Sequence, residues 1–333
     1  MINILDNTLR DGSYVIDFQF SETDTKNITN GLGQLGFKYI EVGHGLGLGA
    51  WNNSKFGLSL ENDDTYIRSA VESSPEAVIS AFFIPGIGSF DDITKAHENG
   101  LRMIRIGTNI NTYQQTKEYV EYAKKLGLIV GVNLMKSYAV KPYEFSSIVK
   151  EIDSWQLADV IYFVDSAGCL FPHEIHEYFD RTKQIITTDL GFHGHNNLSM
   201  GIANTLQSIK SGATFVDSCI QGMGRSAGNA QTEILVYALS KFGIELGIDL
   251  YKLYEFSEKV VRPLMPNKQG LSPDEIHIGV SKFHSSYMPF VKSTCEEIGV
   301  DERRLIKEVS DINCLNPTED LFKKISKELY ENI

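Results

Sequence analysis

Residues 190–197 read Leu-Gly-Phe-His-Gly-His-Asn-Asn, an apolar run that passes directly into a polar one. The apolar part predicts a β-strand over Leu190–His193, and the residues that follow predict an amphipathic helix over Met200–Ser211. Because side chains alternate between the two faces of a strand, His193 and His195 are expected to point to the same side. This unit, a strand and a helix with polar groups between them, is the pattern from which the fold follows.

The same unit recurs along most of the chain. Further strands are predicted over Ile2–Leu5, Tyr39–Val42, Ala77–Phe83, Met103–Ile106, Leu128–Leu134, Val160–Val164 and Thr214–Cys219. Further helices are predicted over Thr23–Leu35, Ser89–Glu98, Tyr113–Leu126, Pro142–Trp155 and Pro172–Thr187, and glycines stand at the expected helix ends at Gly36, Gly100, Gly127 and Gly212. Alternation repeated about eight times predicts an α/β fold, the (β/α)8 TIM barrel, with a doubly wound sheet as the alternative.

The chain is predicted to divide near residue 250. We expect the barrel to occupy residues 1–249 and to end with a helix over Glu233–Phe242. The remainder, residues 250–333, is polar with a mostly helical pattern that is interrupted at Arg262-Pro263 and Pro266-Asn267. It predicts an added C-terminal helical domain.

Composition excludes several classes of protein. The 333 residues are 42% hydrophobic and 22% charged, as in ordinary globular chains, and the formal net charge of -12 disfavours nucleic acid and anionic membranes as partners. No apolar run is long enough to cross a bilayer and the start lacks a basic segment, so we expect a cytoplasmic protein without a signal peptide. The four cysteines lack Cys-x-x-Cys spacing and are expected to be free thiols.

In a TIM barrel the chemistry collects where strands end, and a carboxylate and two imidazoles are found there. Asp11 follows the first strand, and His193 and His195 belong to the seventh. One hard oxygen and two nitrogens predict a divalent metal site, with Mn²⁺ foremost and Mg²⁺, Co²⁺ or Zn²⁺ as alternatives. Arg10 is expected to stabilise enolate charge beside that metal, or to form a salt bridge to Glu41, or both. A core histidine beside a solvated one is the alternative for the pair.

Other polar groups at strand ends are candidates for binding substrate. They are Asn133 and Lys136 after the fifth strand, Ser166 after the sixth, and Arg225 in the glycine-rich turn after the eighth. Lys136 raises a second mechanism, a Schiff-base aldolase, which requires a desolvated lysine of lowered pKa. One interpretation of the turn Gly222–Asn229 is an anion-binding site before a helix, and the alternative is a tight turn without a ligand. The alternating glycines of Gly43–Gly49 do not match a dinucleotide fingerprint and predict an active-site loop.

Three motifs together resemble the metal-dependent pyruvate aldolase and Claisen superfamily. They are Asp6-x-Thr8-Leu9-Arg10-Asp11-Gly12, His193-x-His195-Asn196 and Gly222-x-Gly224-x-x-x-Gly228-Asn229. The superfamily includes 4-hydroxy-2-oxovalerate aldolases, isopropylmalate and homocitrate synthases, and hydroxymethylglutaryl-CoA lyase. The likeness is greatest to the 4-hydroxy-2-oxovalerate aldolases and extends to about Tyr287, through segments such as Glu41-Val42-Gly43-His44-Gly45 and Val261-Arg262-Pro263-Leu264.

This resemblance implies roles for individual residues. Asp11, His193 and His195 match the metal ligands, Arg10 matches the arginine that stabilises the enolate, and Ser166 matches a contact to the 2-oxo acid. The family's helical tail docks an acylating aldehyde dehydrogenase, so a dehydrogenase partner is expected, together with assembly into a homo-oligomer.

The chain departs from the family pattern at two positions. Tyr14 stands where the aldolases place a catalytic histidine, and His284 stands where they carry a tyrosine, before Ser285-Ser286. We hypothesise that His284 supplies the acid/base function, since histidine titrates near neutral pH. The alternative is that both line the pocket and a metal-bound water acts. Asn133 and Lys136 fall where the resembling aldolases tend to be apolar, which predicts a more polar or anionic substrate.

The sequence therefore predicts a metal-dependent C–C lyase. It is expected to cleave or form a 4-hydroxy-2-oxo acid from a small 2-oxo acid and an aldehyde, through a pyruvate-type enolate. One alternative is a Claisen-type acyltransferase that condenses acyl-CoA with a 2-oxo acid, because Arg225 lies in a turn that the synthases also make basic. Another is a non-catalytic binding homologue that lost its base at Tyr14.

Overall fold

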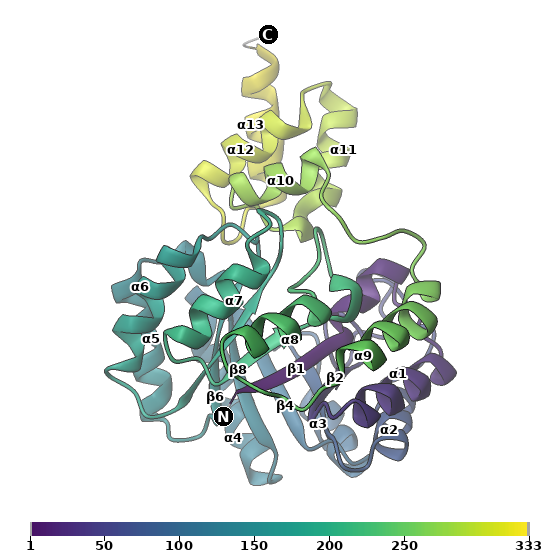
Figure 1. The fold of residues 1–333 in the computed structure, drawn as a ribbon. Helices are drawn as coiled ribbons and strands as arrows, with labels where there is room; N and C mark the ends of the chain where they lie inside the picture. Colours follow the sequence, from purple (N-terminus) through teal and green to yellow (C-terminus); the bar gives the residue numbers. More distant parts are fainter. Residues whose placement is uncertain (1, 332–333) are drawn as a thin grey trace.

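The computed structural model describes residues 2–331 and contains a closed barrel of parallel strands (Figure 1). The strands are β1 (Asn3–Leu9), β2 (Tyr39–Val42), β3 (Val78–Phe83), β4 (Met103–Asn109), β5 (Ile129–Met135), β6 (Val160–Asp165), β7 (Asp189–Gly194) and β8 (Phe215–Ser218). Each strand pairs with the next, and β8 pairs with β1. The TIM barrel is confirmed and the doubly wound sheet is excluded, because an open sheet would leave two edge strands unpaired.

Helices follow the strands and cover the outside of the barrel. They are α1 (Glu22–Gln34), α2 (Asp63–Ser73), α3 (Phe90–Glu98), α4 (Lys117–Lys125), α5 (Pro142–Ser154), α6 (Pro172–Lys183), α7 (Gly201–Lys210) and α8 (Thr232–Lys241). Ser21 and Ser89 cap α1 and α3 through reciprocal hydrogen bonds with Asp24 and Asp92. The sequence prediction missed α2, since the glycine- and asparagine-rich stretch before it obscures its start at the capping residue Asn62.

Two strands run further than predicted. β1 continues to Leu9 rather than Leu5, and β4 continues to Asn109 rather than Ile106. The hydrophobic pattern ends before the strand does, because most residues at these carboxyl ends, such as Asp6, Asn7 and Thr8 of β1, are polar. The strand ends are therefore where the sequence is hardest to interpret and where the chemistry lies.

The barrel interior changes from apolar to polar along the strands. An apolar layer at the amino-terminal side contains Leu5, Tyr39, Met103, Val160 and Phe215. Two residues further along the same strands are Asn7, Glu41, Arg105, Tyr162 and Asp217, all buried. Because inward positions recur every second residue, these form the next layer toward the carboxyl ends. A packed apolar layer thus closes one end and a charged layer supports the other.

The C-terminal segment has two parts. α9 (Leu250–Phe256) lies on the outside of the barrel, and Leu253, Val261 and Met265 pack into the cluster between strands and helices. The remaining helices, α10 (Pro273–Val280), α11 (Met288–Ile298), α12 (Glu302–Ile312) and α13 (Glu319–Glu331), share a separate hydrophobic cluster that begins at Ile278. Figure 1 shows these four helices, here called the cap, above one end of the barrel. The division at residue 250 stays a prediction, and the hydrophobic core itself changes between Met265 and Ile278.

Two expectations about the chain as a whole concern its thiols and membrane segments. All four cysteines are free, as predicted. Burial raises the pKa of the Cys169 and Cys219 thiols well above the ordinary value, so neither is a thiolate nucleophile. None of the helices within residues 2–331 has the length and apolar character needed to span a bilayer.

Candidate active site

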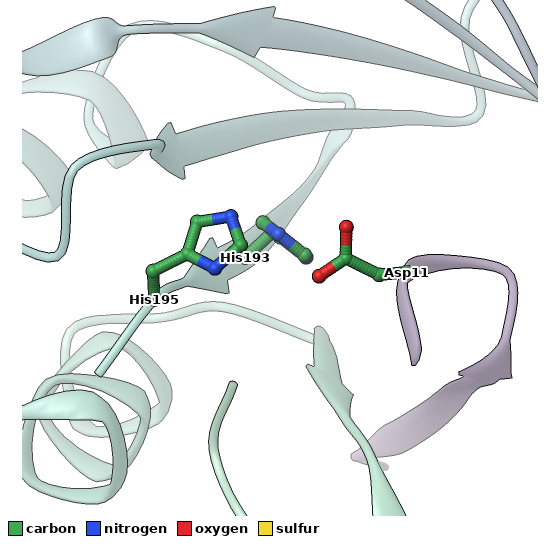
Figure 2. A group of neighbouring side chains, drawn as sticks. All are labelled: Asp11, His193 and His195. Carbon is green, nitrogen blue, oxygen red and sulfur yellow. The ribbon is translucent and has the colours of Figure 1, made fainter. Parts of the chain in front are cut away.

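Three potential metal ligands meet at the carboxyl end of the barrel. Asp11 opens a short 3-10 helix, Asp11–Ile16, directly after β1, while His193 lies on β7 and His195 just beyond it. One ligand atom from each lies within 4.8 Å of the others, and all three residues are buried. Figure 2 shows the Asp11 carboxylate facing the two imidazole rings. The structure thus brings together the group that the sequence predicted.

Hydrogen bonds select one tautomer for each histidine. His193 Nδ1 lies 2.8 Å from Asp217 Oδ2, and His195 Nδ1 lies 3.2 Å from the Gly228 carbonyl oxygen. Carboxylate and carbonyl oxygens only accept, so each Nδ1 donates a proton, and in this tautomer the lone pair that can bind a metal is on Nε2. Within residues 2–331 neither Nε2 has a hydrogen-bond partner. Burial lowers the pKa of His195 to about 3, so this ring is neutral at physiological pH.

The Asp11 carboxylate is held ionised. Burial raises its pKa, but the charge of the adjacent Arg10 outweighs burial and holds the pKa well below the ordinary value. Its two oxygens accept from Arg10 Nη1 at 2.9 Å and from Asn229 Nδ2 at 2.5 Å. One carboxylate and two imidazoles, each with an Nε2 that forms no hydrogen bond to residues 2–331, are a donor set that suits a divalent metal. The residues therefore fit such an ion.

A buried ion-pair network lies beneath this group. Glu41 accepts from Arg10 Nε at 2.7 Å and from Arg105 Nη2 at 2.5 Å. Arg105 Nη1 also donates to Asp217 Oδ2 at 2.6 Å, which connects the network to His193. The predicted pairing of Arg10 with Glu41 is confirmed. The roles of Glu41, Arg105 and Asp217 as supports were not predicted, although charged residues inside apolar strands are a signal for them.

A cavity of about 190 Å³ opens beside the triad. Its lining includes every residue predicted for the site, namely Arg10, Asp11, Tyr14, Asn133, Lys136, Ser166, His193, His195, Arg225 and His284. Gly45 and Leu46 from the predicted active-site loop also line it, together with apolar groups such as Phe82 and Met135. The cavity is small, and both polar and apolar groups line it. It therefore suits a small polar metabolite.

Arg225 contacts both Tyr14 and His284, the two residues at which the chain departs from the family pattern. Its Nη2 donates to His284 Nε2 at 2.8 Å, and its guanidinium lies over the Tyr14 ring at 5.1 Å. Because a guanidinium only donates, Nε2 is the acceptor in this contact. His284 Nδ1 lies 2.6 Å from Ser286 Oγ and 3.3 Å from the Ser286 backbone N. Burial, with Arg225 and Lys136, holds the His284 pKa well below its ordinary value, whereas burial raises the pKa of Tyr14. Both groups are neutral at physiological pH.

The fifth and sixth strands complete the pocket. The Lys136 backbone N–H donates to Ser166 Oγ at 2.9 Å, so the two substrate-binding candidates are fixed to each other. The Lys136 ammonium reaches the cap, where it donates to Tyr287 Oη at 3.0 Å and to the Leu315 carbonyl oxygen. The Asn133 side chain is buried, lines the cavity and has an unpartnered Oδ1. Tyr287 and Leu315 were not predicted, because no local motif marks the part of the cap that meets β5.

Known proteins are similar to this chain in sequence and in fold. Residues 1–260 match the HMGL-like family. A 4-hydroxy-2-oxovalerate aldolase of Rhodococcus opacus (strain B4) is 36% identical over 328 residues, covering 98% of this chain and 94% of that protein. A 4-hydroxy-2-oxovalerate aldolase of Bacillus thuringiensis (strain Al Hakam) is 34% identical over 328 residues, covering 98% and 96%.

Two solved structures bear on the fold alone, because their sequences are more distant. The N-terminal domain of a putative aldolase from Bacteroides vulgatus has a TM-score of 0.75 at 24% identity, covering 87% of this chain and 97% of that chain. The carboxyl transferase domain of Rhizobium etli pyruvate carboxylase has a TM-score of 0.80 at 15% identity, covering 98% of this chain and 60% of that chain. Both agree with a TIM barrel followed by helices. Together with the similarity of the aldolases across barrel and cap, the match over residues 1–260 establishes that the chain belongs to the HMGL-like family.

Proposed function

We propose that this protein is a divalent-metal-dependent aldolase that forms and cleaves a 4-hydroxy-2-oxo acid, with pyruvate as the 2-oxo acid and an aldehyde as its partner. The observation that carries the proposal is the buried group of Asp11, His193 and His195, with both Nε2 atoms free and Arg10 beside it. The aldolase relatives support it, since they are similar across 98% of the chain.

Asp11, His193 and His195 would hold the metal, for which Mn²⁺ is our first candidate and Mg²⁺, Co²⁺ or Zn²⁺ the alternatives. When bound, the ion supplies Lewis-acid polarisation of the 2-oxo group. The protein's own contribution is rigidity, because Asp217 and the Gly228 carbonyl orient the imidazoles and Asn229 orients the carboxylate.

Arg10 stabilises the negative charge that develops on the enolate oxygen. Its guanidinium is held by Glu41 and Asp11, so it is in position before the reaction and needs little reorganisation. Ser166 also lines the cavity, where its hydroxyl would contact the oxo-acid carboxylate. These two residues bind the half of the substrate that becomes pyruvate.

His284 moves the proton of the 4-hydroxyl. In cleavage, Nε2 accepts that proton while the C3–C4 bond breaks, its electron pair forms the enolate, and the 4-oxygen becomes the aldehyde carbonyl. Condensation is the reverse, with the proton returned to the new alkoxide. Nε2 is the accepting atom because it already accepts a hydrogen bond from Arg225 at 2.8 Å, and the hydroxyl would displace that donor. Tyr14 lies across Arg225 and is the alternative acid/base group.

The remaining expectations stay predictions of the resemblance. A dehydrogenase partner for the cap, a homo-oligomer and a cytoplasmic location belong to this group. So does the Claisen alternative with acyl-CoA, for which Arg225 is the candidate residue. A non-catalytic homologue is disfavoured by the complete ligand group and by the position of Arg10.

Loss of the pyruvate methyl signal in D₂O, followed by proton NMR with Mn²⁺-loaded protein, tests the proposal. We expect exchange that EDTA abolishes, that His195→Ala removes, and that the exposed control His173→Ala retains. Absence of exchange with bound Mn²⁺ would contradict a pyruvate enolate, and thiol release from acyl-CoA would then favour the Claisen reaction. Trapping of pyruvate on Lys136 by borohydride would instead support the Schiff-base alternative.

A further inference from the structure

Two cations in the pocket have no carboxylate partner. Lys136 and Arg225 both line the cavity, and within residues 2–331 neither forms an ion pair. The third cation of the pocket, Arg10, is paired with both Asp11 and Glu41. Lys136 is buried, and Arg225 is half-buried with a buried Nε. Cations withdrawn from water in proteins are normally paired, so two unpaired ones in one cavity require an explanation.

Lys136 is held in an unfavourable state. It is 3% exposed, and its backbone is in the left-handed region at φ 57° and ψ 39°. Its ammonium contacts neutral groups, namely the oxygens of Tyr287 and Leu315 and the Tyr287 ring at 4.8 Å. Burial first, and then the charge of Arg225, lower the Lys136 pKa to about 8. Strain and an uncompensated charge at a pocket residue are features that functional sites retain.

The two cations also repel each other. Arg225 disfavours the charged form of Lys136, and both cations disfavour the charged form of His284. Arg225 Nη2 donates to His284 Nε2 at 2.8 Å, and Lys136 donates to Tyr287, whose ring centroid lies 6.1 Å from that of His284. Both cations therefore lie beside one region of the cavity, around the imidazole of His284. An anion placed in that region would relieve the repulsion and pair both cations at once.

Within residues 2–331, two buried polar atoms of the pocket lack hydrogen-bond partners. Asn133 is 2% exposed and has an unpartnered Oδ1, and Arg225 has a buried Nε without an acceptor. The Arg225 Nε–H is a donor without an acceptor, which an anion would supply, whereas the Asn133 Oδ1 is an acceptor and needs a donor. The Arg225 group therefore indicates an anionic ligand, and the Asn133 group indicates a donor on the same substrate.

The position of His284 shows which end of the substrate the anion belongs to. Under the proposed function, on which this step rests, the oxo-acid carboxylate lies at the metal group with Arg10 and Ser166, and His284 faces the 4-hydroxyl. Arg225 contacts His284, and Lys136 contacts its neighbour Tyr287, so both cations lie toward the carbons contributed by the aldehyde. We infer that the aldehyde substrate carries an anionic group, a carboxylate or a phosphate, which Lys136 and Arg225 bind.

Binding can be measured without turnover. The Mn²⁺-loaded full chain would be titrated calorimetrically with 2-oxoadipate and with 2-oxohexanoate, which differ in the terminal carboxylate. We expect the dianion to bind at least about tenfold more tightly, and Lys136→Met to abolish this preference. The exposed control Lys150→Met should retain it, and Lys136→Arg should restore most of it. The inference would be overturned if the wild type bound both acids with equal affinity or bound neither of them. It would also be overturned if Lys136→Met left the preference for 2-oxoadipate unchanged.

Kinetics separate the two possible anions and the two proposals. Condensation with pyruvate would be compared for succinic semialdehyde against butanal, and for glyceraldehyde 3-phosphate against glyceraldehyde. The pair with the larger charged-to-neutral ratio identifies carboxylate or phosphate, and ratios near one in both pairs contradict the inference. If the protein exchanges the pyruvate methyl protons but shows no preference for anionic aldehydes, the aldolase proposal stands and this inference fails. If it prefers the dianion in binding but does not exchange pyruvate protons, the anion site stands and the aldolase proposal fails.

Discussion

Asp217 on β8 accepts hydrogen bonds from His193 Nδ1 at 2.8 Å and from Arg105 Nη1 at 2.6 Å through the same oxygen. It is thus the connection between the proposed metal ligands and the charged layer of the barrel interior. The charge of Arg105 keeps Asp217 ionised: burial raises the pKa of this carboxyl, but Arg105 and His193 lower it below its ordinary value. An ionised acceptor in this place fixes the ring of His193.

Asp217→Asn should weaken metal binding without removing any ligand. The asparagine amide can present its NH₂ group to His193 Nδ1, and that contact favours the tautomer with the proton on Nε2. Because Nε2 is the proposed metal-binding atom, we expect Mn²⁺ affinity to fall by about 10–100-fold. Calorimetric titration with Mn²⁺ measures this, with the exposed Asp180→Asn as the matched control. Circular dichroism would establish that the variant is folded. Unchanged affinity in a folded Asp217→Asn protein would show that His193 does not depend on this contact.

Arg10→Lys should separate metal binding from enolate formation. Lysine keeps the charge but cannot reach Glu41 and Asp11 in the same geometry as the planar guanidinium. We expect pyruvate exchange to slow by about 10²–10³-fold with Mn²⁺ affinity changed much less. The exposed Arg181→Lys serves as control. Equal losses in exchange and in metal affinity would assign Arg10 to metal binding alone.

His284→Ala and Tyr14→Phe distinguish the two candidates for proton transfer. If His284 Nε2 accepts the 4-hydroxyl proton, its removal should lower the rate of 4-hydroxy-2-oxo acid cleavage by about 10²–10⁴-fold. Tyr14→Phe keeps the ring under Arg225 and should cost less than about tenfold. Near-normal cleavage by His284→Ala together with a large loss in Tyr14→Phe would reverse the assignment.

Lys136→Met should stabilise the protein at neutral pH. The Lys136 pKa falls from 10.5 to about 8, because of burial first and then the charge of Arg225. Below about pH 8 the lysine is charged in both the folded and the unfolded chain, and at roughly 1.4 kcal/mol per pKa unit the desolvated charge costs the native state up to about 3 kcal/mol. Denaturant unfolding at about pH 7 should therefore give the variant a free energy of unfolding higher by about 1–3 kcal/mol.

The pH dependence of that difference has a definite sign. Between about pH 8 and pH 10.5 the unfolded lysine holds its proton while the folded one releases it, so the wild type gains stability as pH rises and the difference should shrink. Arg225, Tyr287, His284 and Cys314 surround the ammonium and are unchanged in the comparison. A difference that is constant over this range would mean that Lys136 keeps its ordinary pKa.

Much of the site could be predicted because the barrel topology forces strand ends together. Asp11 and His193 are distant in sequence, yet each stands at a carboxyl end, and closure of the barrel makes those ends neighbours. The Asp217–His193 contact needs more, namely the register of β8 against β7, which the sequence alone does not specify. The Arg225–His284 and Lys136–Tyr287 contacts need the placement of the cap, and no hydrophobic period encodes how two separate cores meet.

The separate core of the cap has an evolutionary consequence. Tyr287 packs against the core of the cap, and His284 and Leu315 lie in the segments that connect its helices, whereas Asp11, His193 and His195 belong to the barrel. Substitutions in the cap can therefore reshape the aldehyde end of the pocket while the packing beneath the enolate-forming groups stays as it is. Selection acting on such a protein can exchange one aldehyde for another and keep the chemistry of the first half-reaction, so new substrates become accessible through changes confined to one module.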